Sequence, residues 1–218
     1  MTDSAPGVER LDVVDELGRH VRTAPRQEVH ERGEWHRVFH CLIATLRGGK
    51  PMIVLQGRSN AKAAFGGLLD ISAAGHLAAG ESPLDGTREL NEELGIAPDP
   101  ADLVPLGVRR FVDDSGEGTL NCELISVYLL RDDRPLAEYV VARGEVDAVY
   151  EVPIAPFLAL LGGGPSIAVR GVRMAGHPDA LEVNLQLTLD RIVPGTQYWA
   201  VLGVMAQRFL AGKRPLAI

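Results

Sequence analysis

Short apolar runs separated by glycine-containing turns dominate the first 160 residues of the chain. Runs of this length that are rich in Val, Ile, Leu and Phe are typical of β-strands. The clearest hairpin joins two of these runs through the turn Gly48–Lys50. The predicted strands cover residues 11–16, 38–46, 52–56, 103–112, 120–130 and 148–152, with a loop over 113–118.

Two segments place their apolar residues at helical spacing instead, Pro83–Leu94 and Ala155–Leu161. In the first of them Leu90 and Leu94 fall on one face, and Gly86 costs up to about 1 kcal/mol relative to Ala. Strands, a helix, further strands and a closing helix together predict an α+β fold.

Three consecutive glycines followed by Pro165 mark the best candidate boundary in the chain. Beyond it the pattern predicts one strand over 167–174 and one helix over 198–210, but no cluster of chemically active residues. We therefore expect this part to pack on the preceding domain or on a second copy in a homodimer. The predicted division is a disordered N-terminus over 1–9, a domain over 10–162 and a C-terminal extension over 163–218.

Composition and charge narrow the possible functions. A net charge of −7 and an isoelectric point near 5.4 argue against nonspecific nucleic-acid binding, which needs a basic surface. No run of 18 apolar residues predicts a membrane span, and residues 1–10 lack the apolar core of a signal peptide. Cys41 and Cys122 lie in apolar runs, so we expect buried free thiols and a cytoplasmic protein.

The most informative stretch is Arg88–Ile96, which carries Glu89, Glu92 and Glu93 at positions i, i+3 and i+4 of the predicted helix. Such residues share a helix face, where like charges repel by roughly 0.2–0.5 kcal/mol per pair. Oxygen ligands converging from one helix suit a hard cation such as Mg²⁺ or Mn²⁺. The alternative is an ordinary amphipathic helix end, closed by Gly95.

This stretch, together with Gly75–Glu81 upstream, resembles the Nudix box, written G-x5-E-x7-R-E-U-x-E-E-x-G-U with U apolar. Only six residues separate Glu81 from Arg88, where the pattern has seven, which leaves the role of Glu81 open. The resemblance implies a Nudix fold, in which a mixed β-sheet is sandwiched between helices. It also implies metal-dependent hydrolysis of a diphosphate linkage.

The resemblance assigns roles to individual residues. The expected metal ligands are Glu89, Glu92 and Glu93, helped by a backbone carbonyl beside Gly75, and Arg88 is expected to hold Glu92. The catalytic base stays open between two residues, Glu89 and Glu123, with Glu117 a third choice. The residues expected to take part in catalysis are therefore Arg88, Glu89, Glu92 and Glu123.

Residues 10–160 also resemble the Nudix hydrolases related to isopentenyl-diphosphate isomerase. In the isomerase a catalytic cysteine stands where this chain has Ala74, which cannot transfer a proton. Its metal is bound by histidines matching His36 and His76 and by two carboxylates, of which Glu123 is kept and Asn121 replaces the other. The intact second half of the box favours hydrolysis. The alternative for His36, His40 and His76 is a structural hydrogen-bonding role.

Arg58 and Lys62 match basic positions that bind the diphosphate in the isomerase, so both are expected to bind substrate, unless they belong to a solvated loop. The predicted function is Mg²⁺- or Mn²⁺-dependent hydrolysis of a nucleoside diphosphate derivative or a similar small organic diphosphate. Two alternatives remain open: an enzyme like the isomerase, and a diphosphate-binding sensor without turnover.

Overall fold

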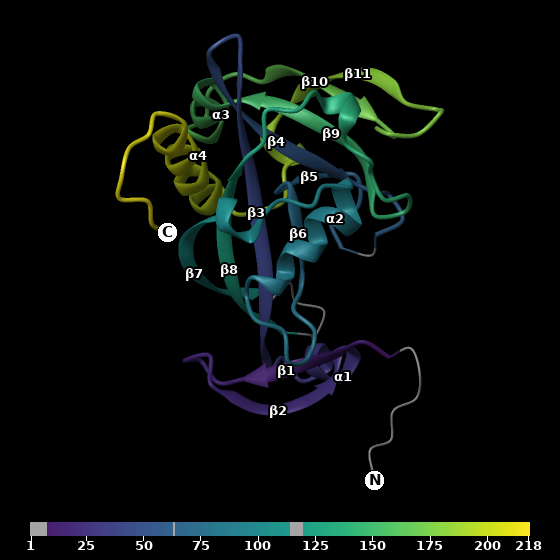
Figure 1. Cartoon of the computed structure of the whole chain (residues 1–218), viewed down its shortest axis with the longest axis vertical. Helices are drawn as coiled ribbons and strands as arrows, with labels where there is room; N and C mark the ends of the chain where they lie inside the picture. The colour runs from purple at the N-terminus through teal and green to yellow at the C-terminus, as the bar shows by residue number, and fades with distance from the viewer. Residues whose placement is uncertain (1–7, 63, 114–119) are drawn as a thin grey trace.

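The computed structural model describes residues 8–62, 64–113 and 120–218 (Figure 1). Most of the N-terminus expected to be disordered, residues 1–7, lies outside this part of the chain, and so does Glu117.

Eleven strands and four α-helices make up the described chain, together with short 3₁₀ turns. In chain order they are β1 (Arg10–Val14), β2 (His20–Pro25), α1 (Arg26–Glu31), β3 (Trp35–Arg47), β4 (Lys50–Arg58), β5 (Leu69–Asp70), β6 (Ala73–His76), η1 (Asp85–Thr87), α2 (Arg88–Leu94), η2 (Pro100–Asp102), β7 (Val104–Asp113), β8 (Asn121–Arg131), η3 (Leu136–Glu138), β9 (Val146–Pro153), α3 (Ile154–Leu161), β10 (Ile167–Arg173), β11 (Leu181–Leu187), η4 (Leu189–Arg191) and α4 (Thr196–Leu210).

The long strand β3 is the centre of the sheet and runs through the whole molecule in Figure 1. It pairs in parallel with β8, and antiparallel with β6 and then with β4. The sheet continues from β4 through β9 and β10 to β11, while β1 and β2 extend it at the other end and β7 pairs with β8. The sheet is therefore mixed, as predicted.

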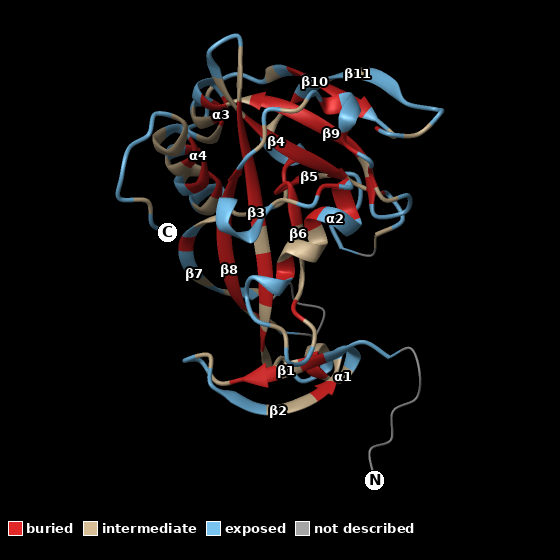
Figure 2. Cartoon of the chain, in the orientation of Figure 1, coloured by how far each residue is buried: buried red, intermediate tan, exposed pale blue. Residues whose placement is uncertain are grey.

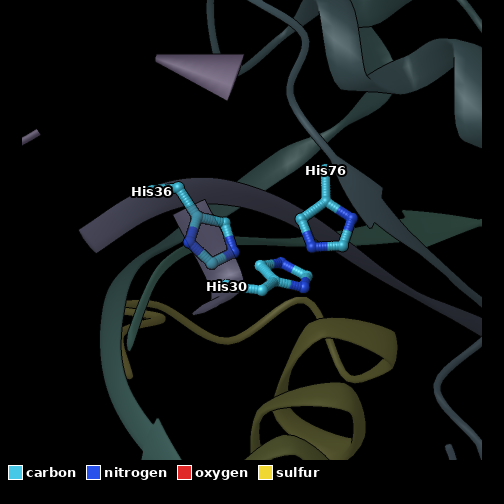
Figure 3. A group of neighbouring side chains, drawn as sticks. All are labelled: His30, His36 and His76. Atoms are coloured by element: carbon cyan, nitrogen blue, oxygen red, sulfur yellow. The ribbon is translucent and has the colours of Figure 1, made fainter. Parts of the chain in front are cut away.

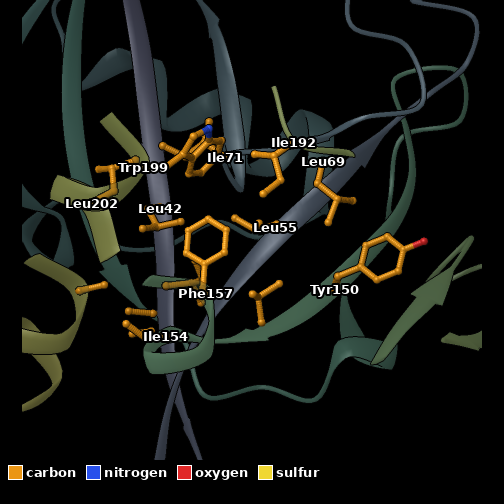
Figure 4. Close-up of a cluster of buried hydrophobic side chains, with 14 of the residues drawn as sticks. Leu42, Leu55, Leu69, Ile71, Tyr150, Ile154, Phe157, Ile192, Trp199 and Leu202 are labelled. Carbon is orange, nitrogen blue, oxygen red and sulfur yellow. The ribbon is translucent and has the colours of Figure 1, made fainter. Parts of the chain in front are cut away.

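Helices cover both faces of this sheet. Alternate side chains of a strand point to opposite faces, so β3 contributes to two buried clusters. Leu42 of β3 belongs to a buried cluster that also contains Phe157 of α3 and Trp199 of α4 (Figure 4). Its neighbours in the strand belong to a second cluster, in which Phe39 packs with Leu90 of α2. Figure 2 shows the buried strands between these layers. The predicted α+β sandwich of the Nudix type is confirmed.

The hydrophobic pattern missed β2, α1, β5, β6 and β11, of which β5 and β6 are only two and four residues long. The side chains of β2 and β11 are mostly exposed or half-buried, and α1 buries only Val29, so no apolar run marks these elements. The predicted helix over Pro83–Leu94 is shorter than expected, because a 3₁₀ turn over 85–87 precedes α2. Gly95, with φ of 67°, ends α2 as predicted.

Residues beyond 163 continue the sheet and one of its covering layers. β10 pairs with β9, and α4 packs against α3 with Trp199 only 2% exposed. The predicted division between a domain over 10–162 and an extension over 163–218 stays a prediction, as does the homodimer. In the described ranges, every helix is too short or too polar for a membrane span. Cys41 and Cys122 are buried free thiols, as predicted.

Candidate active site

The strand β6 and the helix α2 meet where Gly75 faces Glu89. An alanine Cβ at position 75 would lie 2.1 Å from Cδ and Oε1 of Glu89, which is far closer than atoms can approach. The backbone at Gly75 lies in β6, opposite Phe39 of β3, so the glycine is needed for space and not for an unusual φ. The carboxylate of Glu89 thus lies directly against the backbone of β6 at Gly75.

Arg88 holds together the acidic groups at the start of α2. Its guanidinium donates to Glu81 through Nε at 2.8 Å and Nη2 at 3.1 Å, and through Nη1 to Glu89 at 2.5 Å and Glu92 at 3.1 Å. Nη2 also donates to the carbonyl of His76 at 2.7 Å. These contacts raise the pKa of Arg88, with Glu81 the main cause. The expected contact between Arg88 and Glu92 is present. With six residues between Glu81 and Arg88, Glu81 is paired with this arginine.

Glu93 points away from Arg88 into the interior, where it is 4% exposed. Its Oε2 accepts hydrogen bonds from Nε2 of Gln56 and the backbone N–H of Ala74, both at 3.1 Å. Burial raises the pKa of Glu93 to about 7, against the opposing charge of Lys62. The Oε1 of Gln56 is buried and has no hydrogen-bond partner in the part of the chain that the structure describes.

The three glutamates share a helix face but do not converge in the described structure. Glu89 and Glu92 turn toward Arg88, whereas Glu93 turns toward Ala74, and their oxygens do not form a group lying within 4.8 Å of one another. Glu92 has a side chain that is 55% exposed. Glu89 is more buried, and burial raises its pKa while Arg88 opposes the shift.

These residues nevertheless fit a divalent cation. Glu93 is buried and Glu89 is half-buried, and burial raises the pKa of both carboxyl groups. The Oε1 of Gln56, which has no hydrogen-bond partner among the described residues, belongs to the side chain that donates to Glu93 and is a further oxygen near this carboxylate. An all-oxygen donor set of this kind suits Mg²⁺ or Mn²⁺.

The two predicted substrate-binding cations have protein partners. Arg58 donates through Nη1 to Asp70 at 2.8 Å and also contacts the carbonyl of Ala64. The ammonium of Lys62 pairs with Glu145 and lies 3.8 Å from Oε1 of Glu93. Lys62 is therefore beside the box carboxylates, whereas Arg58 is committed to a buried aspartate.

Glu123 lies on the other face of the sheet from α2. It is in register with His36 of β3, and its Oε1 accepts a hydrogen bond from Nδ2 of Asn121 at 2.6 Å. Burial raises its pKa, while this hydrogen bond and the charge of Arg109 oppose the shift. Within the described residues it makes no hydrogen bond to the box glutamates. The structure thus does not bring the second candidate base into contact with the box.

Three histidines meet on this face, His30 of α1, His36 of β3 and His76 of β6 (Figure 3). Their ring centroids are 4.9–5.1 Å apart, and the Nε2 atom of each ring is buried without a hydrogen-bond partner among residues 8–62, 64–113 and 120–218. Burial lowers the pKa of His36 to about 4 and that of His76 to about 2, so both rings are neutral at neutral pH. Neutral imidazoles that aim orphaned nitrogens at one point are suited to a transition metal.

The family resemblance gave His36 and His76, but not His30, as matches to the metal-binding histidines. Sequence reasoning also missed Gln56 and Ala74 as partners of Glu93. A lone polar residue in an apolar strand, such as Gln56, was the available signal. His40 has the structural hydrogen bond that was one alternative, since its Nδ1 lies 3.0 Å from the hydroxyl of Tyr198.

Comparison with known proteins agrees with the box and the fold. The family model described as NUDIX domain matches residues 34–163. An uncharacterized Nudix hydrolase of Clostridium acetobutylicum is 35% identical over 146 residues, which cover 67% of this chain and 70% of that protein. An isopentenyl-diphosphate delta-isomerase of Pectobacterium atrosepticum is 32% identical over 125 residues, covering 56% of this chain and 66% of the isomerase.

Among solved structures, a protein of Deinococcus radiodurans superposes with a TM-score of 0.55 at 24% identity, covering 72% of this chain and 90% of that one. This likeness concerns the fold alone. The family is shown by the matched family model and by the sequence relatives. The chain therefore belongs to the NUDIX domain family, in a group related to isopentenyl-diphosphate isomerases, and is an enzyme of the Nudix pyrophosphatase type.

Proposed function

We propose that this protein hydrolyses the diphosphate linkage of a nucleoside diphosphate derivative, or of a similar small organic diphosphate, with Mg²⁺ or Mn²⁺. The observation that carries the proposal is a pair of carboxylates next to β6, of which Glu93 is buried and Glu89 is half-buried. Glu89 rests on Gly75, and Glu93 accepts the N–H of the preceding residue, so both acids lie along one short stretch of backbone.

In this proposal Glu89, Glu92 and Glu93 hold the cation, together with a carbonyl beside Gly75. A bound divalent cation neutralises phosphate oxygens and activates the attacking water. Arg88 keeps Glu89 and Glu92 in position through its fixed fork of donors, which suits carboxylates.

Positive charge for the substrate comes from the neighbouring loop. Lys62 lies close enough to Glu93 to contact a phosphate bound there, and Arg58 contributes charge from its position on Asp70. The general base is proposed to be Glu89, which is at the box, with Glu123 as the second candidate. Glu123→Gln distinguishes them, because loss of the base lowers kcat more than it changes KM.

The histidine cluster keeps one alternative open, an activity like that of the isomerase. Three orphaned imidazoles with Glu123 nearby are more than hydrolysis at the box requires. Isomerisation, however, moves protons to and from carbon and needs an acid–base pair. Ala74 provides no thiol, and the buried Cys41 has a pKa raised by burial, which makes it a poor proton donor or acceptor at neutral pH. Hydrolysis is therefore the better-supported activity.

The test is a panel of nucleoside di- and triphosphates, nucleotide sugars and isoprenoid diphosphates, incubated with Mg²⁺ or Mn²⁺. We expect phosphate-containing products that require the metal. Glu92→Gln and Glu93→Gln should each lower kcat by orders of magnitude, whereas the exposed Glu138→Gln should not.

Three results would count against the proposal. Near-wild-type turnover by Glu93→Gln would show that this carboxylate of the box takes no part in hydrolysis. Binding without turnover across the whole panel would identify a sensor. Deuterium entering carbon-bound positions of isopentenyl diphosphate in deuterated water would identify an isomerase.

A further inference from the structure

The strand β11 is an outer edge of the sheet. It pairs with β10 along its whole length, and within the described chain no strand pairs with its other side (Figure 1). The ladder between the two strands is regular from Leu181 to Leu187, without a register shift. A straight edge strand presents unpaired backbone N–H and C=O groups, which are a template for another strand.

The edge strand β7 is protected against such pairing. It contains Pro105, a register shift next to that proline, and two arginines, Arg109 and Arg110. The backbone N–H of Ile218 also donates to the carbonyl of Leu106 in this strand at 2.8 Å. Proline, irregular pairing, charged side chains and a covering segment are the means by which proteins prevent sheets from joining at their edges.

The edge strand β2 is protected in the same way, but β11 is not. β2 ends at Pro25, carries Arg22, and has a register shift in its pairing with β1. β11 contains no proline, lysine or arginine, and Glu182 is its only charged residue. An edge of this length without any of these features is suited to pairing with another strand.

The two faces of β11 differ in polarity, because alternate side chains point to opposite faces. On one face Val183 and Leu185 pack against the buried cluster that contains Trp199, but both are only partly buried, and Leu181 is 58% exposed. The opposite face of the strand is polar and exposed, with the residues Glu182, Asn184 and Gln186. The apolar face of the sheet is thus incompletely covered where β11 ends it.

We propose that β11 pairs antiparallel with β11 of a second copy of this chain, so that two protomers share one continuous sheet. The register that pairs all seven residues of the strand places Asn184 opposite its own counterpart, on a two-fold axis. Such an axis uses the same surface on both copies. Because the contact is small, we expect a dimer that dissociates on dilution.

The apolar side chains of β11 match in this register. Directly opposed residues of an antiparallel pair lie on the same face of the sheet. Val183 of each protomer lies opposite Leu185 of the other, so four aliphatic side chains that are partly buried in the single chain meet across the axis. The contact continues the buried apolar face of one protomer into that of the other.

The polar side chains match as well. Glu182 lies opposite Gln186, whose amide N–H groups donate to a carboxylate, and no two charged residues of β11 are opposed. Glu182 makes no ion pair with any residue in the described ranges, so its carboxylate is available. This self-complementarity selects a second copy of the chain as the partner. The proposal does not depend on the proposed hydrolysis.

The first measurement is sedimentation velocity over a hundredfold range of protein concentration. The wild type should change from monomer to dimer as the concentration rises. Gln186→Glu should raise the dimer dissociation constant at least about tenfold, because it sets two pairs of like charges opposite each other. Adding Glu182→Gln to that variant exchanges the two residues and should restore wild-type dimerisation.

The matched control is Ala168→Glu. Ala168 is exposed and lies directly opposite Gln186 in β10, so the same charge is added on the same face, one strand further from the edge. We expect dimerisation close to that of the wild type. The melting temperature of every variant shows whether its fold is retained.

The second measurement tests the position of the axis by mixing Asn184→Lys with Asn184→Asp. Each variant alone opposes like charges at the axis, whereas a dimer of one with the other opposes unlike charges. Native mass spectrometry separates the three dimers by mass and should show mainly the mixed dimer. If Gln186→Glu does not fold, this mixture decides the matter.

Four results would overturn the proposal. They are a wild type that stays monomeric over the whole concentration range, an unchanged dissociation constant in Gln186→Glu, a double variant as weak as Gln186→Glu, and a random mixture of dimers from the two Asn184 variants. A purely structural role of β11 would lower the melting temperature of Gln186→Glu without recovery of a dimer in the double variant.

Discussion

At the scale of single residues, the lack of a side chain at Gly75 leaves the room that the carboxylate of Glu89 occupies. Gly75→Ala should displace Glu89 and lower kcat at least tenfold while the protein stays folded, since alanine is tolerated in a strand. Steady-state kinetics with a circular dichroism spectrum measures both. Gly162→Ala is the control, because a Cβ there meets only ordinary contacts at 3.5 Å. Full activity of Gly75→Ala would show that catalysis does not depend on the position of Glu89 against Gly75.

A second residue-scale prediction concerns the pH dependence of stability in the metal-free protein. Burial raises the pKa of Glu93 to about 7 from an ordinary value of 4.5, so the native state holds a proton more tightly than the unfolded state. The contribution of Glu93 to the free energy of unfolding is therefore fully present below about pH 4.5. The free energy of unfolding then falls by roughly 3 kcal/mol as the pH rises through about 7.

Chemical unfolding in EDTA between pH 5 and pH 8 checks this. The wild type should lose more stability over that interval than Glu93→Gln, which cannot ionise. Added Mg²⁺ should reduce the loss, because a cation favours the charged carboxylate. Identical pH profiles for the two proteins would mean that Glu93 is already ionised at pH 5.

The box was predictable at the residue scale because its residues are close in sequence. Glu89 and Glu93 follow from helical spacing, and Gly75 from the motif. The partners of Glu93 and of His40 were not predictable, because they depend on strands and a helix far apart in the chain. Tyr198 and His40 are 158 residues apart, and no local pattern indicates such a contact.

At the scale of elements, the start of α2 is set by packing and not by helix propensity. Gly86 lies in the 3₁₀ turn before α2, and an alanine Cβ there would lie 2.5 Å from Phe39. Propensity alone would make Gly86→Ala stabilising by up to about 1 kcal/mol. We expect the opposite, a loss of about 1–3 kcal/mol from overpacking. Urea unfolding measures the sign, and a gain in stability would show that the turn can move away from β3.

The apolar strands and the two helices with a buried stripe were predicted with nearly the right bounds, because burial on one or both faces leaves a pattern. The elements that were missed lack such a pattern of buried apolar residues. β11 is exposed along most of its length and is identified by its pairing with β10, while α1 is a six-residue helix with one buried side chain. The 3₁₀ turn of η1 was read as helix because apolar spacing does not distinguish the two.

At the scale of the whole molecule, the residues after 163 complete the core on one face. Trp199 and Leu202 pack in the cluster that contains Phe157, and β10 covers the edge of β9. A chain ending at Gly163 should therefore fail to unfold cooperatively and should bind a hydrophobic dye. Calorimetry on the shortened and full-length proteins tests this. A sharp transition in the shortened protein would make residues 10–162 an independent domain.

The four-residue strand β6 lies between two groups of polar side chains and contacts both. The backbone N–H of Ala74 donates to Glu93, and Gly75 leaves the space that the carboxylate of Glu89 occupies. The side chain of His76 lies with His30 and His36 on the other side. Because neighbouring side chains leave a strand in opposite directions, the side chain at position 74 can be exchanged without removing the hydrogen bond that the same residue makes to Glu93. A substitution at position 74 therefore changes the face of β6 that packs against the cluster of Leu42 and Trp199, and it leaves the contact between β6 and Glu93 of α2 in place.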